Sequence, residues 1–248
     1  MTIRHLLTII VLAVALLVSA IACVAQEPED IWKFLKVEQP LVIAHRGASS
    51  VAPENTLAAI RAALELGVDV IEIDVHKTRD GELVVIHDNT VDRTTDGTGW
   101  VHDFTLDQLR ELNAGSWFRP LFRRERIPTL REVLEIVKDQ AILLIELKGT
   151  ATEVLAVELV RELGMSEQVI IQSFDANQIQ KAKHAAPDIP TILLVRVPEH
   201  SSEPERAALW MANKAEQIGA SGIGIRHNWH TPELMAIAAQ RGLAIFVW

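Results

Sequence analysis

Apolar and polar positions alternate in two ways along the chain from about residue 40 onward. Short apolar runs of strand length recur at residues 41–44, 70–75, 83–86, 141–146, 169–172, 191–195, 222–225 and 244–248. Segments with helical period lie between most of these runs, at 56–66, 129–137, 153–163 and 231–241. This alternation is typical of parallel βα units. Because eight strands close a barrel, the pattern predicts an α/β fold of the TIM-type (β/α)8 class.

Three features depart from a regular barrel. Only His76 to Glu82 separate the second and third apolar runs, too few residues for a crossover helix, so we expect an extended return without a helix. Residues 89–127 have no clear period and predict a long insertion after the third strand, either a functional loop or a small subdomain. The last apolar run ends at Trp248, so we expect a chain truncated before the last helix of the barrel.

The first residues have a different character from the rest of the chain. Arg4 precedes an apolar run from residue 6 to about residue 25, and acidic and polar residues follow. This layout predicts a signal peptide at 1–25, a linker at 26–39 and a barrel domain at 40–248, in an exported protein that is periplasmic or extracellular. Membrane association through the N-terminus would follow if cleavage before Cys23 led to lipidation, or if the apolar run stayed as an anchor.

Charge and composition narrow the classes of partner. The chain carries 24 Lys and Arg against 33 Asp and Glu, a formal net charge of -9. A negative surface field repels phosphate polymers, so nucleic acid is not an expected partner. An enzyme that acts on anionic phosphodiesters with this net charge needs a local source of positive charge, from a metal ion or from placed Arg and Lys side chains. Nothing in the pattern indicates an oligomeric state.

Carboxylates follow the predicted strands where an active site of a TIM-type barrel is expected. Active sites of such barrels lie at the C-terminal ends of the strands. Glu72 and Asp74 end the second apolar run two residues apart, so their side chains project from the same face, and Glu146 ends the fourth run. Three carboxylates without cysteine suit a hard divalent cation, Mg²⁺ or Ca²⁺, better than zinc. The alternative is a buried ionic network of these carboxylates with Arg46 and Lys148, without a metal.

Two histidines and two cations stand beside the same strand ends. His45 ends the first run and His87 the third, and imidazoles that exchange protons near neutral pH are candidates for a general base and a general acid. Arg46 offers a planar fork for a phosphate oxygen and Lys148 a point charge. Both cations also suit charge balance for the nearby carboxylates, and the two roles are compatible.

These residues belong to a longer ordered series of motifs. The series reads HRGAS (45–49), PENT (53–56), G-x-D-x-IEIDV (67–75), T-x-DG (78–81), VVIHD (84–88), RTTDGTG (93–99), IPTL (127–130), IELK (145–148) and QSFD (172–175). The series resembles the glycerophosphodiester phosphodiesterase family from about residue 40 to the last residue. The resemblance implies a TIM-type barrel with an insertion after the third strand. It also implies hydrolysis of a small-molecule glycerophosphodiester to sn-glycerol 3-phosphate and an alcohol.

The resemblance also implies roles for single residues. Glu72, Asp74 and Glu146 would bind Ca²⁺ or Mg²⁺, and His45 and His87 would form the acid-base pair. Arg46 and Lys148 would contact the phosphate. Glu54 is expected near the substrate, although starting the first helix would explain it equally well. The aromatic residues Trp117, Phe118, Phe174 and Trp248 could line the pocket or serve only in packing, and His76 lies outside the matched motifs and is expected to be structural or exposed.

Two other functions fit the same residues. The site could act on lipid-bearing phosphodiesters at a membrane, as a lysophospholipase D does. The chain could also be a non-catalytic exported binding domain that keeps the barrel without turnover, although the presence of all the carboxylates and both histidines favours an enzyme. The attacking group also remains open between water and the neighbouring glycerol hydroxyl, the second of which would give a cyclic phosphate intermediate.

Overall fold

The structure is a computed structural model that describes residues 41–196 and 203–248. The signal peptide and linker predicted for 1–39, with Cys23, therefore lie outside the described residues. Among the described residues, no helix combines the length and the apolarity needed to cross a bilayer.

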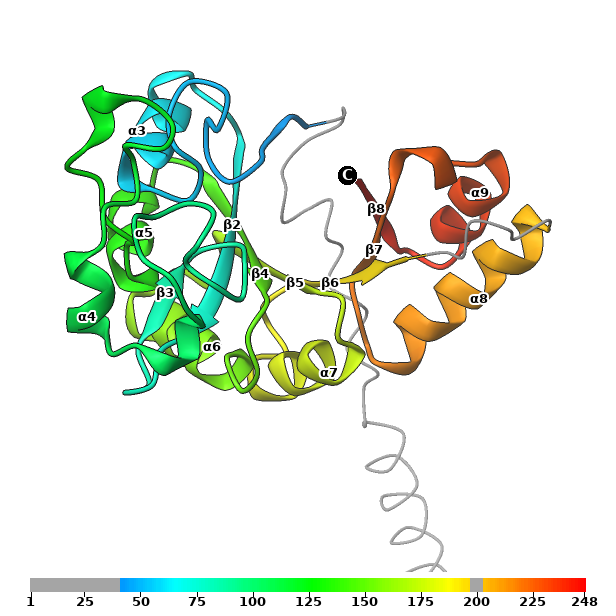
Figure 1. The fold of residues 1–248 in the computed structure, drawn as a ribbon. Coiled ribbons are helices and arrows are strands. Elements are labelled where there is room, and N and C mark those ends of the chain that lie inside the picture. Colours follow the sequence, from blue (N-terminus) through cyan, green and yellow to red (C-terminus); the bar gives the residue numbers. More distant parts are fainter. Residues whose placement is uncertain (1–40, 197–202) are drawn as a thin grey trace, which may run out of the picture.

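A curled, mostly parallel β-sheet with helices on its outer face forms the fold (Figure 1). The strands are β1 (Ile43–Ala44), β2 (Val70–Lys77), β3 (Leu83–Val85), β4 (Ile142–Leu147), β5 (Val169–Ser173), β6 (Thr191–Val195), β7 (Gly222–Ile225) and β8 (Ala244–Val247). The helices are α3 (Leu57–Glu65), α4 (Leu106–Glu111), α5 (Leu130–Val137), α6 (Glu153–Glu162), α7 (Ala176–Ala185), α8 (Pro204–Gln217) and α9 (Pro232–Gln240). The α/β barrel-type architecture expected from the alternating pattern is confirmed.

The third strand differs from the prediction. β3 pairs with β2 in the antiparallel sense, and β4 pairs directly with β2 on its other side in the parallel sense. The parallel order is therefore β1-β2-β4-β5-β6-β7-β8, with β3 as a hairpin partner of β2. The absence of a helix between β2 and β3 is confirmed, but β3 is not one of the parallel barrel strands, because a short turn can join only antiparallel neighbours. Among the described residues no pairing joins β8 to β1.

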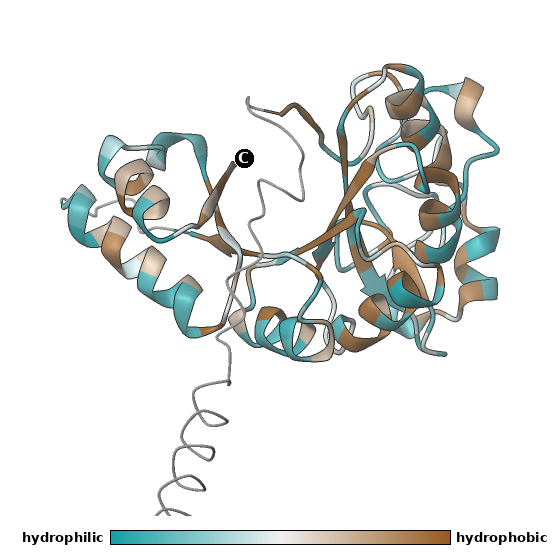
Figure 2. Cartoon of the chain, turned by 180° about the vertical axis from the view of Figure 1, so that it is seen from behind, coloured by the Kyte–Doolittle hydropathy of each residue, from teal (hydrophilic) through white to brown (hydrophobic). Residues whose placement is uncertain are grey.

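Alternating residues of the strands face two different environments. Ile71, Ile73 and Val75 of β2 belong to the large core between the sheet and the helices. Val70 belongs to a smaller apolar layer on the inner face, with Leu144 of β4 and side chains of β5, β6 and β8. Figure 2 shows the apolar colour concentrated on the strands and on the helix faces toward them. Because side chains alternate along a strand, the next inward positions after Val70 are the carboxylates described below.

The segment between β3 and α5 carries its own small core. It contains α4 and two short 3-10 helices, η1 (Val101–Asp103) and η2 (Pro120–Phe122). Val91, Val101 and Leu109 are buried together with Val84 and Ile86 from the β3 region. Thr105 closes a capping box with Gln108 at the start of α4, which fixes the first turn of this short helix. The insertion is thus anchored to the strand that leads to His87.

Candidate active site

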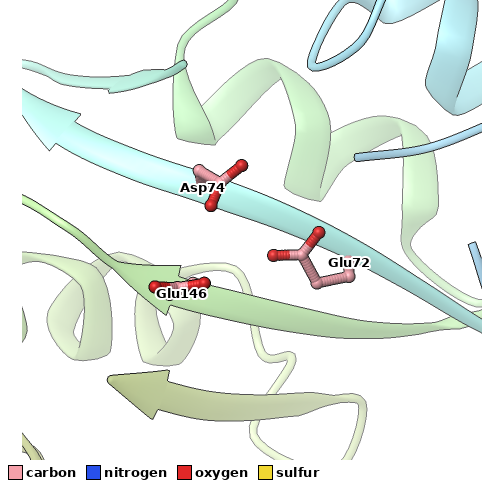
Figure 3. Close-up of side chains that lie close together, drawn as sticks. All are labelled: Glu72, Asp74 and Glu146. Carbon is pink, nitrogen blue, oxygen red and sulfur yellow. The ribbon is translucent and has the colours of Figure 1, made fainter. Parts of the chain in front are cut away.

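Glu72, Asp74 and Glu146 converge on the inner face of the sheet. Asp74 lies directly opposite Glu146 in the parallel pairing of β2 with β4, and Glu72 lies two residues before Asp74. Figure 3 shows the three side chains close together on two neighbouring strands. One carboxylate oxygen from each residue lies within 4.8 Å of the others, and all three residues are buried. The three carboxylates therefore form a compact set of oxygen ligands of the kind that divalent cations take.

Burial and the charge of neighbouring carboxylates oppose the ionisation of Glu72 and Glu146. Burial, followed by the charge of Asp74, raises the pKa of Glu72 well above its usual value. Burial also raises the pKa of Glu146, against the lowering effect of Lys148. Such a cluster must take up a proton or a cation to be stable at neutral pH, because uncompensated buried charge is costly.

Lys148 and Arg46 supply only part of the missing positive charge. The Nζ atom of Lys148 lies 2.8 Å from Glu146 Oε1 and 3.4 Å from Asp74 Oδ1. Nε of Arg46 lies 3.5 Å from Asp74 Oδ2, while its Nη1 donates to Glu54 Oε1 at 2.7 Å. Glu72 receives only the backbone N–H of Arg46, at 2.9 Å, among the hydrogen bonds of the described residues. The ionic network weighed as an alternative to a metal is present, but it leaves Glu72 without a cationic partner there.

A left-handed turn after β1 aims this N–H at Glu72. Arg46 has φ 57° and Gly47 φ 75°, and Gly47 N donates to Glu72 O at 3.2 Å. A Cβ on Gly47 would lie 2.8 Å from the backbone carbonyl carbon of Ala59 in α3. Glycine at 47 therefore allows both the positive φ and the close approach of the turn to the helix.

Asn55, in the motif PENT, is a further partner of the cluster, and the sequence analysis did not assign it a role. Its Nδ2 donates to Asp74 Oδ2 at 2.8 Å, and its Oδ1 accepts from Asp74 N at 3.3 Å. The N-cap of α3 is the next residue, Thr56, whose side chain accepts from Ala59 N. Asp74 Oδ1 is buried without a hydrogen-bond partner in the described part of the chain. That oxygen, with Lys148 Nζ 3.4 Å away, can accept a ligand.

His87 is held by an ionic chain that reaches back to Arg46. The Nδ1 atom of His87 lies 2.6 Å from Asp88 Oδ1, and Arg93 Nε donates to Asp88 Oδ2 at 2.7 Å. The same guanidinium donates to both oxygens of Glu54, at 2.7 and 2.9 Å. Glu54 also accepts from Arg46, so it bridges the two arginines. The sequence reasoning missed Arg93, although its motif RTTDGTG was part of the matched series.

These contacts hold the carboxyl groups of Asp88 and Glu54 in their charged form. The hydrogen bonds from Arg93 are the largest cause that lowers the pKa of Asp88, and His87 adds to the effect against partial burial. Burial alone would raise the pKa of Glu54, but its bonds to Arg93 and Arg46 lower it on balance. Glu54 thus holds two arginines in place, a role that helix initiation alone would not require.

Backbone contacts place His87 beside the carboxylate cluster. Ile86 N donates to Asp74 O at 3.0 Å. The ring of His76 is buried, and its Nε2 lies 3.1 Å from His87 O. His76 is thus structural rather than exposed, one of the two environments expected for it. It fixes the main chain at His87 from the same face of β2 as Glu72 and Asp74.

His45 lies at the other side of the turn, at the end of β1. It is exposed, yet partial desolvation and then Arg46 lower its pKa, against the attraction of Asp74 and Glu54. The charge of His87 also acts on it. A lowered pKa keeps the imidazole neutral and able to accept a proton at neutral pH.

A cavity of about 500 Å³ opens beside the cluster. His87, Glu146, Lys148, Phe174 and Arg196 are among its lining residues. The Phe174 ring packs edge to face with the Trp248 ring, with 5.7 Å between centroids. Of the four aromatic residues proposed for the pocket, Phe174 lines this cavity and Trp248 supports it, whereas Trp117 packs with Phe118 in the insertion. Arg196 is a lining residue that the motifs did not indicate.

Comparison with known proteins agrees with this geometry. Residues 45–248 match the family model for the glycerophosphoryl diester phosphodiesterase family. A glycerophosphodiester phosphodiesterase of Caldanaerobacter subterraneus subsp. tengcongensis is 42% identical over 214 residues, which cover 84% of this chain and 84% of that protein. The crystal structure of glycerophosphodiester phosphodiesterase from Agrobacterium tumefaciens is 34% identical, with TM-score 0.72 over 84% of this chain and 86% of the other.

A third relative was solved with a bound molecule. A phosphodiesterase of Oleispira antarctica, in complex with the product sn-glycerol-3-phosphate, is similar at 29% identity and TM-score 0.72, over 84% of each chain. The family match spans most of the sequence and contains every strand that contributes a carboxylate to the cluster. This chain therefore belongs to the glycerophosphoryl diester phosphodiesterase family.

Proposed function

We propose that this protein hydrolyses glycerophosphodiesters to sn-glycerol 3-phosphate and an alcohol with the help of a divalent cation, Ca²⁺ or Mg²⁺. The observation that carries the proposal is the buried set of Glu72, Asp74 and Glu146, which has more negative charge than its neighbours balance. Family membership and the product complex of the Oleispira relative support the choice of substrate.

The residues present fit such a cation. Asp74 Oδ1 is buried and accepts no hydrogen bond in the described part of the chain, although Lys148 Nζ lies 3.4 Å away. All three side chains offer the oxygen ligands that Ca²⁺ and Mg²⁺ prefer. When bound there, a divalent cation would polarise a phosphoryl oxygen and offset its negative charge. Lys148 adds a positive charge at the wall of the cavity, where it would attract the phosphate.

The two imidazoles would then move protons. Asp88 accepts from Nδ1 of His87, which leaves Nε2 for exchange with the substrate. His45, with its lowered pKa, suits the complementary role at the end of β1. One imidazole would take the proton of the attacking hydroxyl or water and the other would protonate the leaving alcohol oxygen.

Arg46 has a more defined role than phosphate contact alone. Its guanidinium is tied to Glu54 and close to Asp74. We expect it chiefly to balance and orient these carboxylates, with phosphate contact as an additional role. The attacking group is either water or the adjacent glycerol hydroxyl, and proximity favours the internal attack.

Release of glycerol 3-phosphate from glycerophosphocholine and glycerophosphoethanolamine tests the proposal. We expect activity that EDTA abolishes and that Ca²⁺ or Mg²⁺ restores. A cyclic glycerophosphate that appears early would support internal attack. Faster hydrolysis of a lysolipid than of any glycerophosphodiester would replace the proposal with the lysophospholipase D reaction, and no turnover with any metal would leave a binding domain.

We also propose that the protein is exported by the apolar segment at its N-terminus. The support is the sequence pattern of residues 1–25. Expression in a bacterium, followed by fractionation and N-terminal sequencing, tests this. A mature chain that begins after residue 25 supports a cleaved signal, a lipid-modified Cys23 supports anchoring, and an unprocessed cytoplasmic chain contradicts export.

A further inference from the structure

Arg196 places a positive charge at one end of the cavity that also contains His87 and Lys148. It follows directly after β6 and lines the cavity together with Phe174. Its guanidinium carbon lies 4.4 Å from the centre of the Phe174 ring. This stacking fixes the plane of the guanidinium and leaves its N–H groups at the edge for a planar acceptor.

Arg196 differs from the other arginines near the site in its ion pairs. Arg46 and Arg93 both bind Glu54, and Arg93 also binds Asp88. In the described ranges 41–196 and 203–248, Arg196 makes its stacking contact with Phe174 and no ion pair with a carboxylate. Asp175 lines the same cavity, but its side chain caps α7 by accepting from Asn177 N at 2.8 Å.

The aromatic residues at this end do not form an open cage. One face of Phe174 is covered by Arg196, and its ring also packs against Trp248 at an interplanar angle of 81°. A quaternary ammonium group needs free aromatic faces and is repelled by a guanidinium. A carboxylate, by contrast, matches the geometry of the guanidinium fork and gains a charge-assisted hydrogen bond.

We propose that Arg196 forms an alcohol-side subsite that selects glycerophosphodiesters whose head group carries a carboxylate. The inference rests on the proposed function, because it requires the phosphate to bind at Glu146 and Lys148. The cavity of about 500 Å³ extends from these two residues to Arg196, so the alcohol side of the substrate would point toward Arg196. The leaving alcohol then lies beside Phe174 in the cavity, with its carboxylate at the guanidinium of Arg196. Choline-type head groups are disfavoured at the same place.

Two substrates that differ by one carboxylate test this subsite. Glycerophosphoserine is glycerophosphoethanolamine with a carboxylate added, so the ratio of their kcat/KM values isolates the contribution of that group. We expect the unaltered full chain to favour the serine compound by about tenfold, the effect of one hydrogen bond to a charged group. Arg196→Gln should bring the ratio close to one, and Arg196→Lys should keep part of it, because a charge remains without the planar fork.

Arg61→Gln is the matched control, since Arg61 is exposed on α3 away from the cavity-lining residues and should leave the ratio unchanged. A ratio near one in the unaltered protein overturns the proposal, as does a ratio that Arg196→Gln leaves unchanged while both rates fall together. If Arg196→Gln does not fold, Arg196→Lys decides. If the unaltered protein hydrolyses neither compound, the proposed function fails, and calorimetric binding of the two compounds decides the subsite by the same ratio.

Discussion

The Nδ1 atom of His87 lies 2.6 Å from Oδ1 of Asp88, which fixes one nitrogen of the imidazole and frees the other. A carboxylate in this place holds the tautomer and stabilises the protonated ring. We expect Asp88→Asn to lower kcat by about 10- to 100-fold with a smaller change in KM, and His87→Ala to lower it by about 100-fold or more. Steady-state kinetics measures both, and Asp107→Asn on the surface of α4 serves as the control. Near-normal turnover of His87→Ala would refute the acid-base role.

Arg93 joins Asp88 to Glu54 and should act on the reaction through His87. Arg93→Met leaves two carboxylates without their main partner, so the nearby imidazole becomes easier to protonate. We expect kcat to fall by about tenfold, and the limb of the pH-rate profile that reports His87 to move to higher pH. Arg93→Lys should recover part of both effects. Arg119→Met, in the same insertion, is the control; an unshifted profile in Arg93→Met would limit Arg93 to a role in folding.

The raised pKa values in the carboxylate cluster predict how stability depends on pH without metal. Glu72 and Glu146 keep protons in the folded state that the unfolded chain has lost above about 4.5. The stability they contribute is therefore fully present below that pH and is lost as the pH rises through their raised folded pKa values. Glu54, with its lowered pKa, has the opposite effect, but only below its own usual range.

Urea unfolding of EDTA-treated protein between about pH 5 and pH 8 measures this slope. Glu72→Gln should flatten it, whereas Glu65→Gln on the surface should not. A divalent cation replaces the protons, so at 100 times its Kd it should add about 2.7 kcal/mol to the unfolding free energy. Equal stability with and without metal, together with a flat pH profile, would contradict a metal site in the cluster.

Two glycines with nearly the same positive φ allow the cost of backbone strain to be distinguished from the cost of a steric clash. Gly47 has φ +75° and a Cβ added there would meet Ala59, whereas Gly67 has φ +68° with nothing within 4 Å of an added Cβ. We expect Gly67→Ala to cost about 1–2 kcal/mol for the left-handed backbone. Gly47→Ala should cost at least about 1 kcal/mol more, because the added methyl group meets backbone rather than a flexible side chain. Urea denaturation of both variants measures the difference, and equal losses would contradict the close approach.

Residue periodicity predicted most strands because their two-sided burial leaves nearly unbroken apolar runs. It missed α7 and α8, whose polar faces and alanines give a weaker pattern: α7 buries only Gln178, Ile179 and Ala182. It also placed β3 among the parallel strands. The direction of a strand depends on the strand with which it pairs. A short turn joins β3 to β2, and β4 occupies the other side of β2, so β3 pairs with β2 in the antiparallel sense.

The carboxylate cluster could be predicted from spacing, since Glu72 and Asp74 share a strand face and Asp74 lies opposite Glu146. The partners that arrive from loops could not. Arg93 reaches Glu54 over 39 residues of sequence, and Arg196 meets Phe174 from a different strand end. Such contacts depend on the paths of the loops at the rim of the barrel, and the local pattern of apolar and polar residues does not predict those paths.

The hairpin of β2 and β3 has a further consequence for how the site can change. After β2 the chain forms β3 and the insertion, and it rejoins the parallel ladder beside β2 only at β4. The whole segment between β2 and β4 therefore lies outside the parallel ladder. The three carboxylates proposed as metal ligands lie on that ladder, whereas His87 and Arg93 lie in the segment between β2 and β4. One of the two imidazoles and its partners therefore lie apart from the carboxylates along the chain, so substitutions in that segment could change proton transfer while Glu72, Asp74 and Glu146 keep their places.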